Sequence, residues 1–246
     1  MSSNSPRIRG DSPSYDAPYP IGQIPDGVVL SIGKQIVHRR AVGMGDITGD
    51  DFGSIFADSI GGVHKASPVG IADVNWNGCA WSVKTVKAKQ PFKQGKVRLI
   101  SGRNSPDYSL GIENPRANIS HTGRAVLSIW NQRVNAALDE HSDMRVMILI
   151  RNIETQEFVL FEEEAHRFVP DEYRWEENKR KNFCGYDRLT NKQRFTWQPH
   201  GSQFTVHRDV PHSARKFKIT RSVPLVEPDV VLDYIQFRDN WVEIVG

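Results

Sequence analysis

The stretch from Gly70 to Lys87, Gly-Ile-Ala-Asp-Val-Asn-Trp-Asn-Gly-Cys-Ala-Trp-Ser-Val-Lys-Thr-Val-Lys, predicts the hairpin around which the rest of the chain is arranged. Its Asn-Gly dipeptide at positions 77 and 78 favours a tight turn between two antiparallel strands. Asp73 lies on the first strand and Lys84 on the second, so their side chains can converge at one end of the hairpin. A carboxylate beside a lysine suits metal-assisted hydrolysis of a phosphodiester, because the carboxylate can hold Mg²⁺ while the ammonium group orients the attacking water.

The alternation of side chains along a strand decides which residues of the second strand face this site. Successive residues point to opposite faces, so Ser82 and Lys84 share one face while Trp81 and Val83 share the other. We therefore place Lys84 in the site and Trp81 and Val83 in the core. Lys87 lies on the opposite face and would take the role of Lys84 only in another register.

The segments around the hairpin predict an α/β fold. Apolar residues recur at helical spacing over 46–62, with Thr48 as the cap, and over 123–141, with Thr122 as the cap. Strands are expected near 69–75, 79–87, 96–101, 144–150, 158–161, 194–198, 203–208 and 215–220. The order helix, three strands, helix, strand predicts a mixed central β-sheet flanked by helices, with an appended β-rich C-terminal region. The pattern over 229–245 leaves helix and strand both open.

Length and composition fit one soluble domain. The 246 residues are 38% apolar and 25% charged, which is too polar for a membrane protein, and no apolar run is long enough to span a bilayer. We expect a mobile N-terminal arm over 1–20 and a single domain over 21–246, with a core at about 46–160 and an appended region at about 161–246. The two cysteines predict neither a disulfide framework nor a zinc site, and a cytoplasmic location is expected.

Positive charge is concentrated locally although the formal net charge is only +3. The run from Lys84 to Arg103 contains seven basic residues and no Asp or Glu, and a second basic cluster spans 179–181. Surface of this kind suits contacts with a phosphate backbone, and Lys87 and Lys93 are candidates for them. A solvated lysine-rich face is the alternative.

The order of elements, with Asp73 on one strand and Lys84 on the next, resembles the PD-(D/E)xK nuclease superfamily and most of all a type II restriction endonuclease. The resemblance covers roughly residues 46–151. It implies a restriction-endonuclease-like core, Mg²⁺ without a small-molecule cofactor, and hydrolysis of double-stranded DNA by a homodimer. On this resemblance Asp73 would bind the metal and Lys84 would position the attacking water.

One position departs from the family pattern, because Ser82 stands where an acid is expected two residues before Lys84. Related enzymes with Ser-x-Lys take the missing acid from about thirteen residues further on, but here that region is Val97-Arg98. The candidates for the missing metal ligand are Asp58, then Asp51, from the helix over 46–62, and Glu113 from the loop before the long helix. The acidic run over 162–164 is interpreted as a solvated or salt-bridged face.

Two polar segments are candidates for reading DNA bases. One is the turn between the strands at 194–198 and 203–208, and the other is the loop over 101–109. Amides, hydroxyls and guanidinium groups of these segments can bond base edges in the major groove. The candidate residues are Gln198, His200, Ser202, Gln203, Arg103 and Asn104. A polar turn and an ordinary surface loop are the alternatives.

Three other functions stay open from sequence. The chain could be another DNA nuclease on the same core, from a repair or mobile-element system. It could be a nucleic-acid-binding module that lost its acid at Ser82. A third alternative is a carbohydrate-binding or structural β-rich protein in which tryptophans form a platform.

Overall fold

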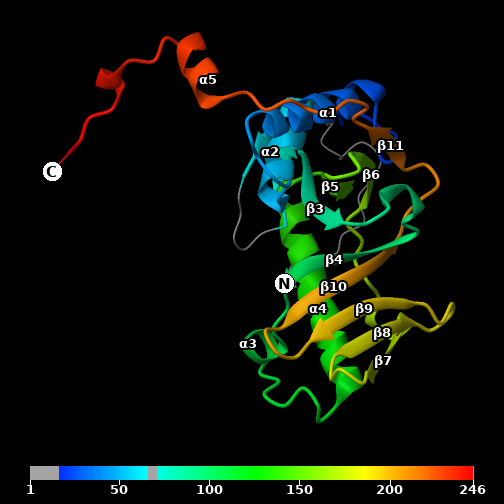
Figure 1. The fold of residues 1–246 in the computed structure, drawn as a ribbon. Coiled ribbons are helices and arrows are strands. Elements are labelled where there is room, and N and C mark those ends of the chain that lie inside the picture. The colour runs from blue at the N-terminus through cyan, green and yellow to red at the C-terminus, as the bar shows by residue number, and fades with distance from the viewer. Residues whose placement is uncertain (1–16, 66–70, 246) are drawn as a thin grey trace, which may run out of the picture.

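The computed structural model describes residues 17–65 and 71–245, which form two β-sheets and five α-helices (Figure 1). The first sheet has the strand order β1 (Val63–His64), β2 (Val74–Trp76), β3 (Cys79–Lys87), β5 (Asp143–Asn152), β6 (Glu157–Glu164), β11 (Arg215–Lys218). The second sheet has the order β4 (Lys96–Arg103), β10 (Gln203–Asp209), β9 (Gln193–Gln198), β8 (Phe183–Asp187), β7 (Tyr173–Glu177). The helices are α1 (Asp26–Ala41), α2 (Gly49–Ile60), α3 (Pro106–Leu110), α4 (Ile119–Glu140) and α5 (Pro228–Tyr234). Short 3₁₀ turns are η1 (Pro91–Lys93), η2 (Pro170–Glu172) and η3 (Asp239–Trp241).

The first sheet is mixed, and the predicted α/β class is confirmed. β3 pairs antiparallel with β2 and parallel with β5, and β5 pairs antiparallel with β6. The parallel pair needs a long crossover, and the chain from β4 through α4 supplies it. Helices α1 and α2 pack on one face of this sheet, while α4 lies on the other face, between the two sheets (Figure 1).

The strand expected near 96–101 forms, but it does not belong to the central sheet. It is β4, which pairs with β10 in the second sheet, and the third strand beside the hairpin is instead the two-residue β1. β4 buries alternate residues only, as an antiparallel strand with one solvated face does, whereas β5 is buried on both faces. The second sheet therefore combines β4 with strands that follow residue 170, and β11 returns to the first sheet.

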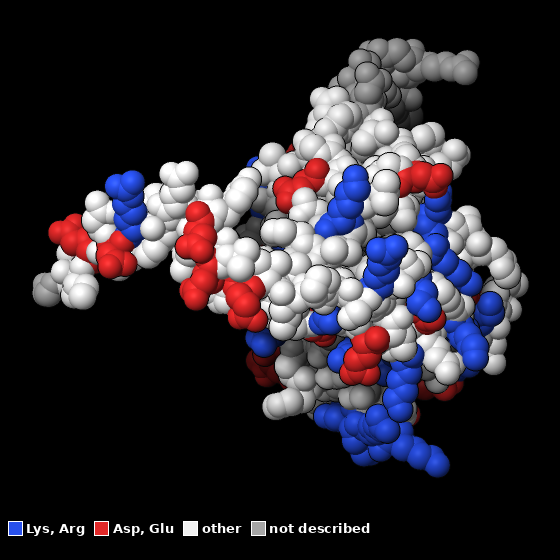
Figure 2. All heavy atoms as spheres, turned by 45° about the horizontal axis from the view of Figure 1, so that its top comes forward, with Lys and Arg blue, Asp and Glu red and all other residues white. Residues whose placement is uncertain are grey.

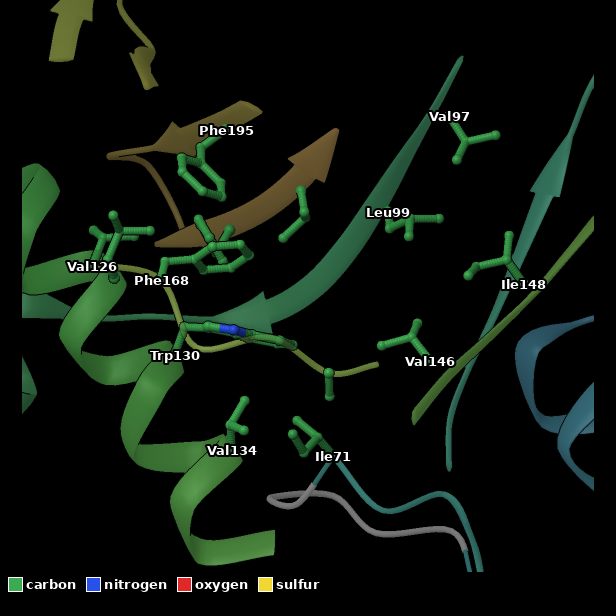
Figure 3. Packing of buried hydrophobic residues seen from close by; sticks show 14 of the residues in the cluster. Ile71, Val97, Leu99, Val126, Trp130, Val134, Val146, Ile148, Phe168 and Phe195 are labelled. Carbon is green, nitrogen blue, oxygen red and sulfur yellow. The ribbon is translucent and has the colours of Figure 1, made fainter. Parts of the chain in front are cut away.

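The core between the two sheets is centred on α4. Val126, Trp130 and Val134 of this helix face Val97 and Leu99 of β4 and the apolar side chains of β5 (Figure 3). At the start of the helix, Gly123 admits the ring of Trp175, because a Cβ at this position would lie 2.3 Å from that ring. The two sheets and α4 thus share one continuous hydrophobic cluster.

A side chain caps the N-terminus of each of the two predicted helices. Thr48 and Asp51 form a reciprocal capping box at the start of α2, as the sequence predicts for Thr48. The cap of α4 is Asn118 rather than Thr122, so this helix begins one turn earlier than expected. The Thr122 hydroxyl instead donates to the carbonyl oxygen of Pro115 at 2.8 Å.

Of the two alternatives for the acidic run at the end of β6, Glu162 is salt-bridged rather than solvated. Its carboxylate is buried and accepts hydrogen bonds from Trp81 Nε1 at 3.0 Å and from an Arg145 guanidinium nitrogen at 3.1 Å. The Tyr19 hydroxyl also donates to it, at 3.3 Å. Within the predicted mobile arm, residues 1–16 lie outside the described residues, whereas Tyr19 packs into the body and is only 5% exposed.

The last described segment leaves the body of the molecule. After β11 the chain passes the end of α1 and carries α5 and η3 away from both sheets (Figure 1). The pattern over 229–245 thus resolves as one short helix and a 3₁₀ turn. Among the described helices, none combines the length and the apolar character that crossing a membrane requires.

Candidate active site

The hairpin brings Asp73 and Lys84 together. Asn77 and Gly78 both have positive φ, 41° and 82°, which pairs β2 with β3 so that Val74 lies opposite Trp81. Asp73 directly precedes β2, and its Oδ2 lies 3.6 Å from Lys84 Nζ. Both side chains are about one-quarter exposed, so this ion pair is open to solvent on one side.

Asp73 is held in place by the neighbouring strand. Its Oδ2 accepts a hydrogen bond from the backbone N–H of Val83 at 2.7 Å and from the Ser82 hydroxyl at 3.3 Å. Ser82 is 1% exposed, so its hydroxyl has little competition from water. The serine that replaces the expected acid therefore orients Asp73.

The two faces of β3 separate core from site as the alternation predicts. Trp81 and Val83 lie in the cluster beneath α1 and α2. Ser82 and Lys84 lie on the other face, where they line a small cavity with Leu99 of β4 and Trp130 of α4.

Glu163 and Arg208 line the same cavity, and sequence reasoning missed both. Ser82, Val146 and Glu163 occupy one row across β3, β5 and β6, which places Glu163 on the face of Lys84. Glu163 Oε1 lies 2.6 Å from Arg208 Nε, yet both atoms are buried without an aligned hydrogen-bond partner among the described residues. Burial raises the pKa of Glu163. The sequence does contain a signal for Glu163. It lies two residues after Phe161 and four after Val159 on one strand, so it shares a face with these apolar residues.

The carboxylates predicted to supply the missing ligand lie elsewhere. Asp51 caps α2 and pairs with Arg39 at 2.7 Å, and its hydrogen bond from Thr48 lowers its pKa. Asp58 is exposed on α2, the helix that covers the face of the sheet opposite Lys84, and Glu113 is exposed in the loop after α3. In the described parts of the chain, no three His, Cys, Asp or Glu side chains form a group that could hold a metal ion.

A cleft of about 500 Å³ opens beside the site, between the end of β3 and the second sheet. Arg208 lines both this cleft and the small cavity at Lys84. The cations along the cleft are Lys87, Lys96, Arg98, Lys192, Arg194 and Arg208. Asp209, which also lines it, is 3.3 Å from Arg194 and 3.5 Å from Lys192. The cleft is therefore strongly positive. Of the two predicted phosphate contacts, Lys87 lines the cleft, whereas Lys93 is exposed on η1.

His207 lies in this cleft as a neutral side chain. Burial, reinforced by Arg98 and Lys96, lowers its pKa from 6.5 to about 4. Its Nε2 is 2.9 Å from the Thr196 hydroxyl.

We predict that this histidine makes stability depend on pH. The unfolded chain binds the proton below pH 6.5, but the folded chain does so only near pH 4, so the free energy of unfolding falls as the pH drops between these values. Urea unfolding at pH 7 and pH 4.5 is expected to show a smaller fall for His207→Gln than for the wild type. His200→Gln, at an exposed position, should behave as the wild type does. Equal falls in all three proteins would contradict the prediction.

The two predicted base-reading segments meet at the other end of β4 and β10. The backbone N–H of Asn104 donates to the carbonyl oxygen of Ser202 at 2.9 Å, and Arg103 pairs with Gln203 across the strands. Gln198 pairs with Gln203, and His200 is exposed at the tip.

Asn104 is not available to DNA, contrary to its prediction. It is fully buried, its side-chain nitrogen donates to the carbonyl oxygen of Val126, and its own carbonyl oxygen accepts from Trp197 Nε1. These bonds fix the loop to α4 and β9. Arg103 stays exposed beside the hairpin tip.

No family model, curated protein or solved structure matches this chain.

Proposed function

We propose that this chain is a Mg²⁺-dependent endonuclease that hydrolyses double-stranded DNA at specific sequences, as a type II restriction enzyme does. The observation that carries the proposal is the Asp73–Lys84 pair. Asp73 Oδ2 lies 3.6 Å from Lys84 Nζ at the open end of the hairpin, away from its turn. The order of elements adds support: apart from β4, which joins the second sheet, and the short α3, the chain passes from α2 through β1, β2 and β3 to α4 and β5, which is helix, three strands, helix and strand. Helices on both faces of a mixed sheet agree with the restriction-endonuclease-like core that the resemblance implies.

The donor set on this face is compatible with Mg²⁺. Protein sites commonly hold this ion through one or two carboxylates, with water and substrate phosphates completing the coordination. Asp73 would supply one carboxylate, and Glu163, which lines the cavity at Lys84 and whose Oε1 lies 2.6 Å from Arg208 Nε, would supply the second. When bound, Mg²⁺ would supply a polarised phosphate and a more acidic water molecule.

The residues of the chain then have distinct roles. Asp73 would hold the ion, and the Ser82 hydroxyl together with the Val83 N–H fixes the orientation of its carboxylate. The Lys84 ammonium group positions the attacking water and offsets the negative charge that develops on the phosphate. Arg208 links this centre to the basic cleft, because it lines both.

Binding and sequence reading are assigned to the second sheet. The cations of the cleft suit the phosphate backbone, and the paired tips that carry Arg103, Gln198 and Gln203 suit base edges. A homodimer with twofold symmetry would match a palindromic site and cut both strands.

Incubation of the purified chain with plasmid DNA and Mg²⁺ tests the proposal. Discrete fragments, absent when EDTA replaces Mg²⁺, are the expected result. A smear would indicate a nuclease without sequence specificity. Retention of uncut DNA in a gel-shift assay would indicate a binding module that lost its activity with the acid at Ser82, and either outcome would overturn the proposal.

A further inference from the structure

The C-terminal arm, residues 222–245, exposes an unusual amount of apolar surface. Of the 22 large hydrophobic side chains exposed in the described residues, 11 lie between Leu225 and Val245. Tyr234 is 88% exposed, and Ile244 is 95% exposed. Apolar surface gathered in this way on one segment marks an interaction site.

The arm leaves the body directly beside α1. The backbone N–H of Val226 donates to the carbonyl oxygen of Ala41, the last residue of that helix, at 2.8 Å. From there the arm runs away from the body rather than back over it (Figure 1). In this arrangement the apolar side chains of α5 project where another molecule can reach them.

Helix α1 offers a matching surface. Its inner face buries Ile32 and Ile36, but its outer face also carries apolar residues, Leu30 at 61% and Val37 at 37% exposed. Leu30 and Val37 are seven residues apart and Lys34 lies between them, so the three form one stripe along the helix. A helix with apolar residues on both faces is typical of one that is covered on both sides.

Charge favours contact between the arm and the body of another copy. Residues 225–245 contain five acidic residues and one arginine, a net charge of −4, in a chain whose formal net charge is +3. The remainder of the chain therefore carries +7. Figure 2 shows the acidic side chains along the arm and many Lys and Arg side chains over the visible face of the body.

We propose that the C-terminal arm of one copy packs on the outer face of α1 of a second copy, and that the two copies exchange arms around a twofold axis. A second copy fits better than the chain's own α1, because the arm already passes the end of that helix and continues away from it. Exchange buries both apolar surfaces twice in one closed assembly. The inference adds a contact surface to the homodimer of the proposed function, and its test requires no DNA, so either proposal can fail without the other.

Sedimentation velocity on the full chain measures the assembly directly. We expect a particle of about twice the 27.9 kDa of one copy. Val230→Asp with Tyr234→Asp places two charges on one side of α5, and Leu30→Asp with Val37→Asp does the same on the outer face of α1. Each double variant is expected to weaken self-association by at least about 100-fold. Leu189→Asp, at a 94% exposed leucine between β8 and β9, is the matched control and should remain dimeric.

Mixing the two double variants tests whether the arm of one copy binds α1 of another copy. The arm variant keeps an intact α1 and the α1 variant keeps an intact arm, so the mixture regains one of two arm–α1 contacts and should form heterodimers. Wild type that stays monomeric at about 100 µM would overturn the proposal, whether the arm is exposed or folded back on its own helix. A dimer that survives both double variants would overturn it as well. The arm variant alters no core residue, so misfolding of the α1 variant would not remove the test.

Discussion

Asp73→Asn is expected to lower the rate of Mg²⁺-dependent DNA cleavage by about 1,000-fold, which is about 4 kcal/mol of transition-state stabilisation. The amide cannot replace the charge of the carboxylate toward a divalent cation, although it keeps the volume and can still accept the Val83 N–H bond. DNA affinity measured in Ca²⁺ or without metal should change little, because the basic cleft is unaltered. Single-turnover cleavage of a labelled duplex checks the rate, and a gel-shift assay checks the affinity.

Matched variants separate this site from the alternatives. Lys84→Ala should reduce cleavage to a similar extent, and Glu163→Gln should also reduce it, with thermal unfolding showing that the fold persists. Asp58→Asn and Glu113→Gln change exposed carboxylates and should cut as the wild type does. If Asp58→Asn were as inactive as Asp73→Asn, the metal would be held by a helix carboxylate and the assignment of Glu163 would be wrong.

The parts of this site that sequence predicts are those set by neighbours along the chain. A turn at Asn77-Gly78 requires positive φ, which these residue types tolerate, and the turn then fixes which residues of β2 and β3 face each other. Side chains alternate between the two faces of β3, so Trp81 points into the core and Lys84 points into the site. The contact between Asp73 and Lys84 follows from these two local rules.

The parts that sequence did not predict depend on pairing between distant segments. The alternation in β4 indicates a strand but not its partner, and only the pairing with β10 places this strand outside the central sheet. Glu163 is similar, because its place in the cavity at Lys84 depends on the pairing of β5 with β3 and of β6 with β5. Asn104 stands in a segment rich in polar residues, yet a buried hydrogen bond to the Val126 carbonyl holds it in the core.

The pairing of β4 with β10 also determines where the proposed phosphate-binding and base-reading residues lie relative to the Lys84 cavity. Arg208 on β10 lies at the junction between the cavity of Lys84 and the basic cleft. At the opposite end of the same strand pair, Arg103 and Gln203 present the candidate base-reading side chains. A duplex that follows β4 and β10 would therefore contact cations at one end and the polar tips at the other, with the hairpin carboxylate beside it.

Removing three cations from the cleft is expected to weaken DNA binding by roughly 100-fold at low salt, because charge-assisted contacts contribute roughly 1–3 kcal/mol each and are partly screened. The variant is Lys96→Ala, Arg98→Ala and Lys192→Ala in one chain. All three side chains are exposed, so the fold should be unaffected. Binding measured by fluorescence anisotropy over a range of salt should also show a shallower dependence on salt, by about 0.9 in the logarithmic slope for each phosphate that the variant no longer neutralises.

The basic cluster over 179–181 supplies the control with the same change of charge. It lies in the turn between β7 and β8, at the end of the second sheet away from the cleft, since Phe183 pairs with Trp197 while Tyr186 pairs with Gln193. Lys179→Ala, Arg180→Ala and Lys181→Ala together should weaken binding much less than the cleft variant. Equal reductions in affinity would mean that DNA responds to the net charge of the molecule rather than to the cleft. A reduction confined to the cleft variant would place the phosphate backbone along β4 and β10, within reach of Arg208 and the Lys84 centre.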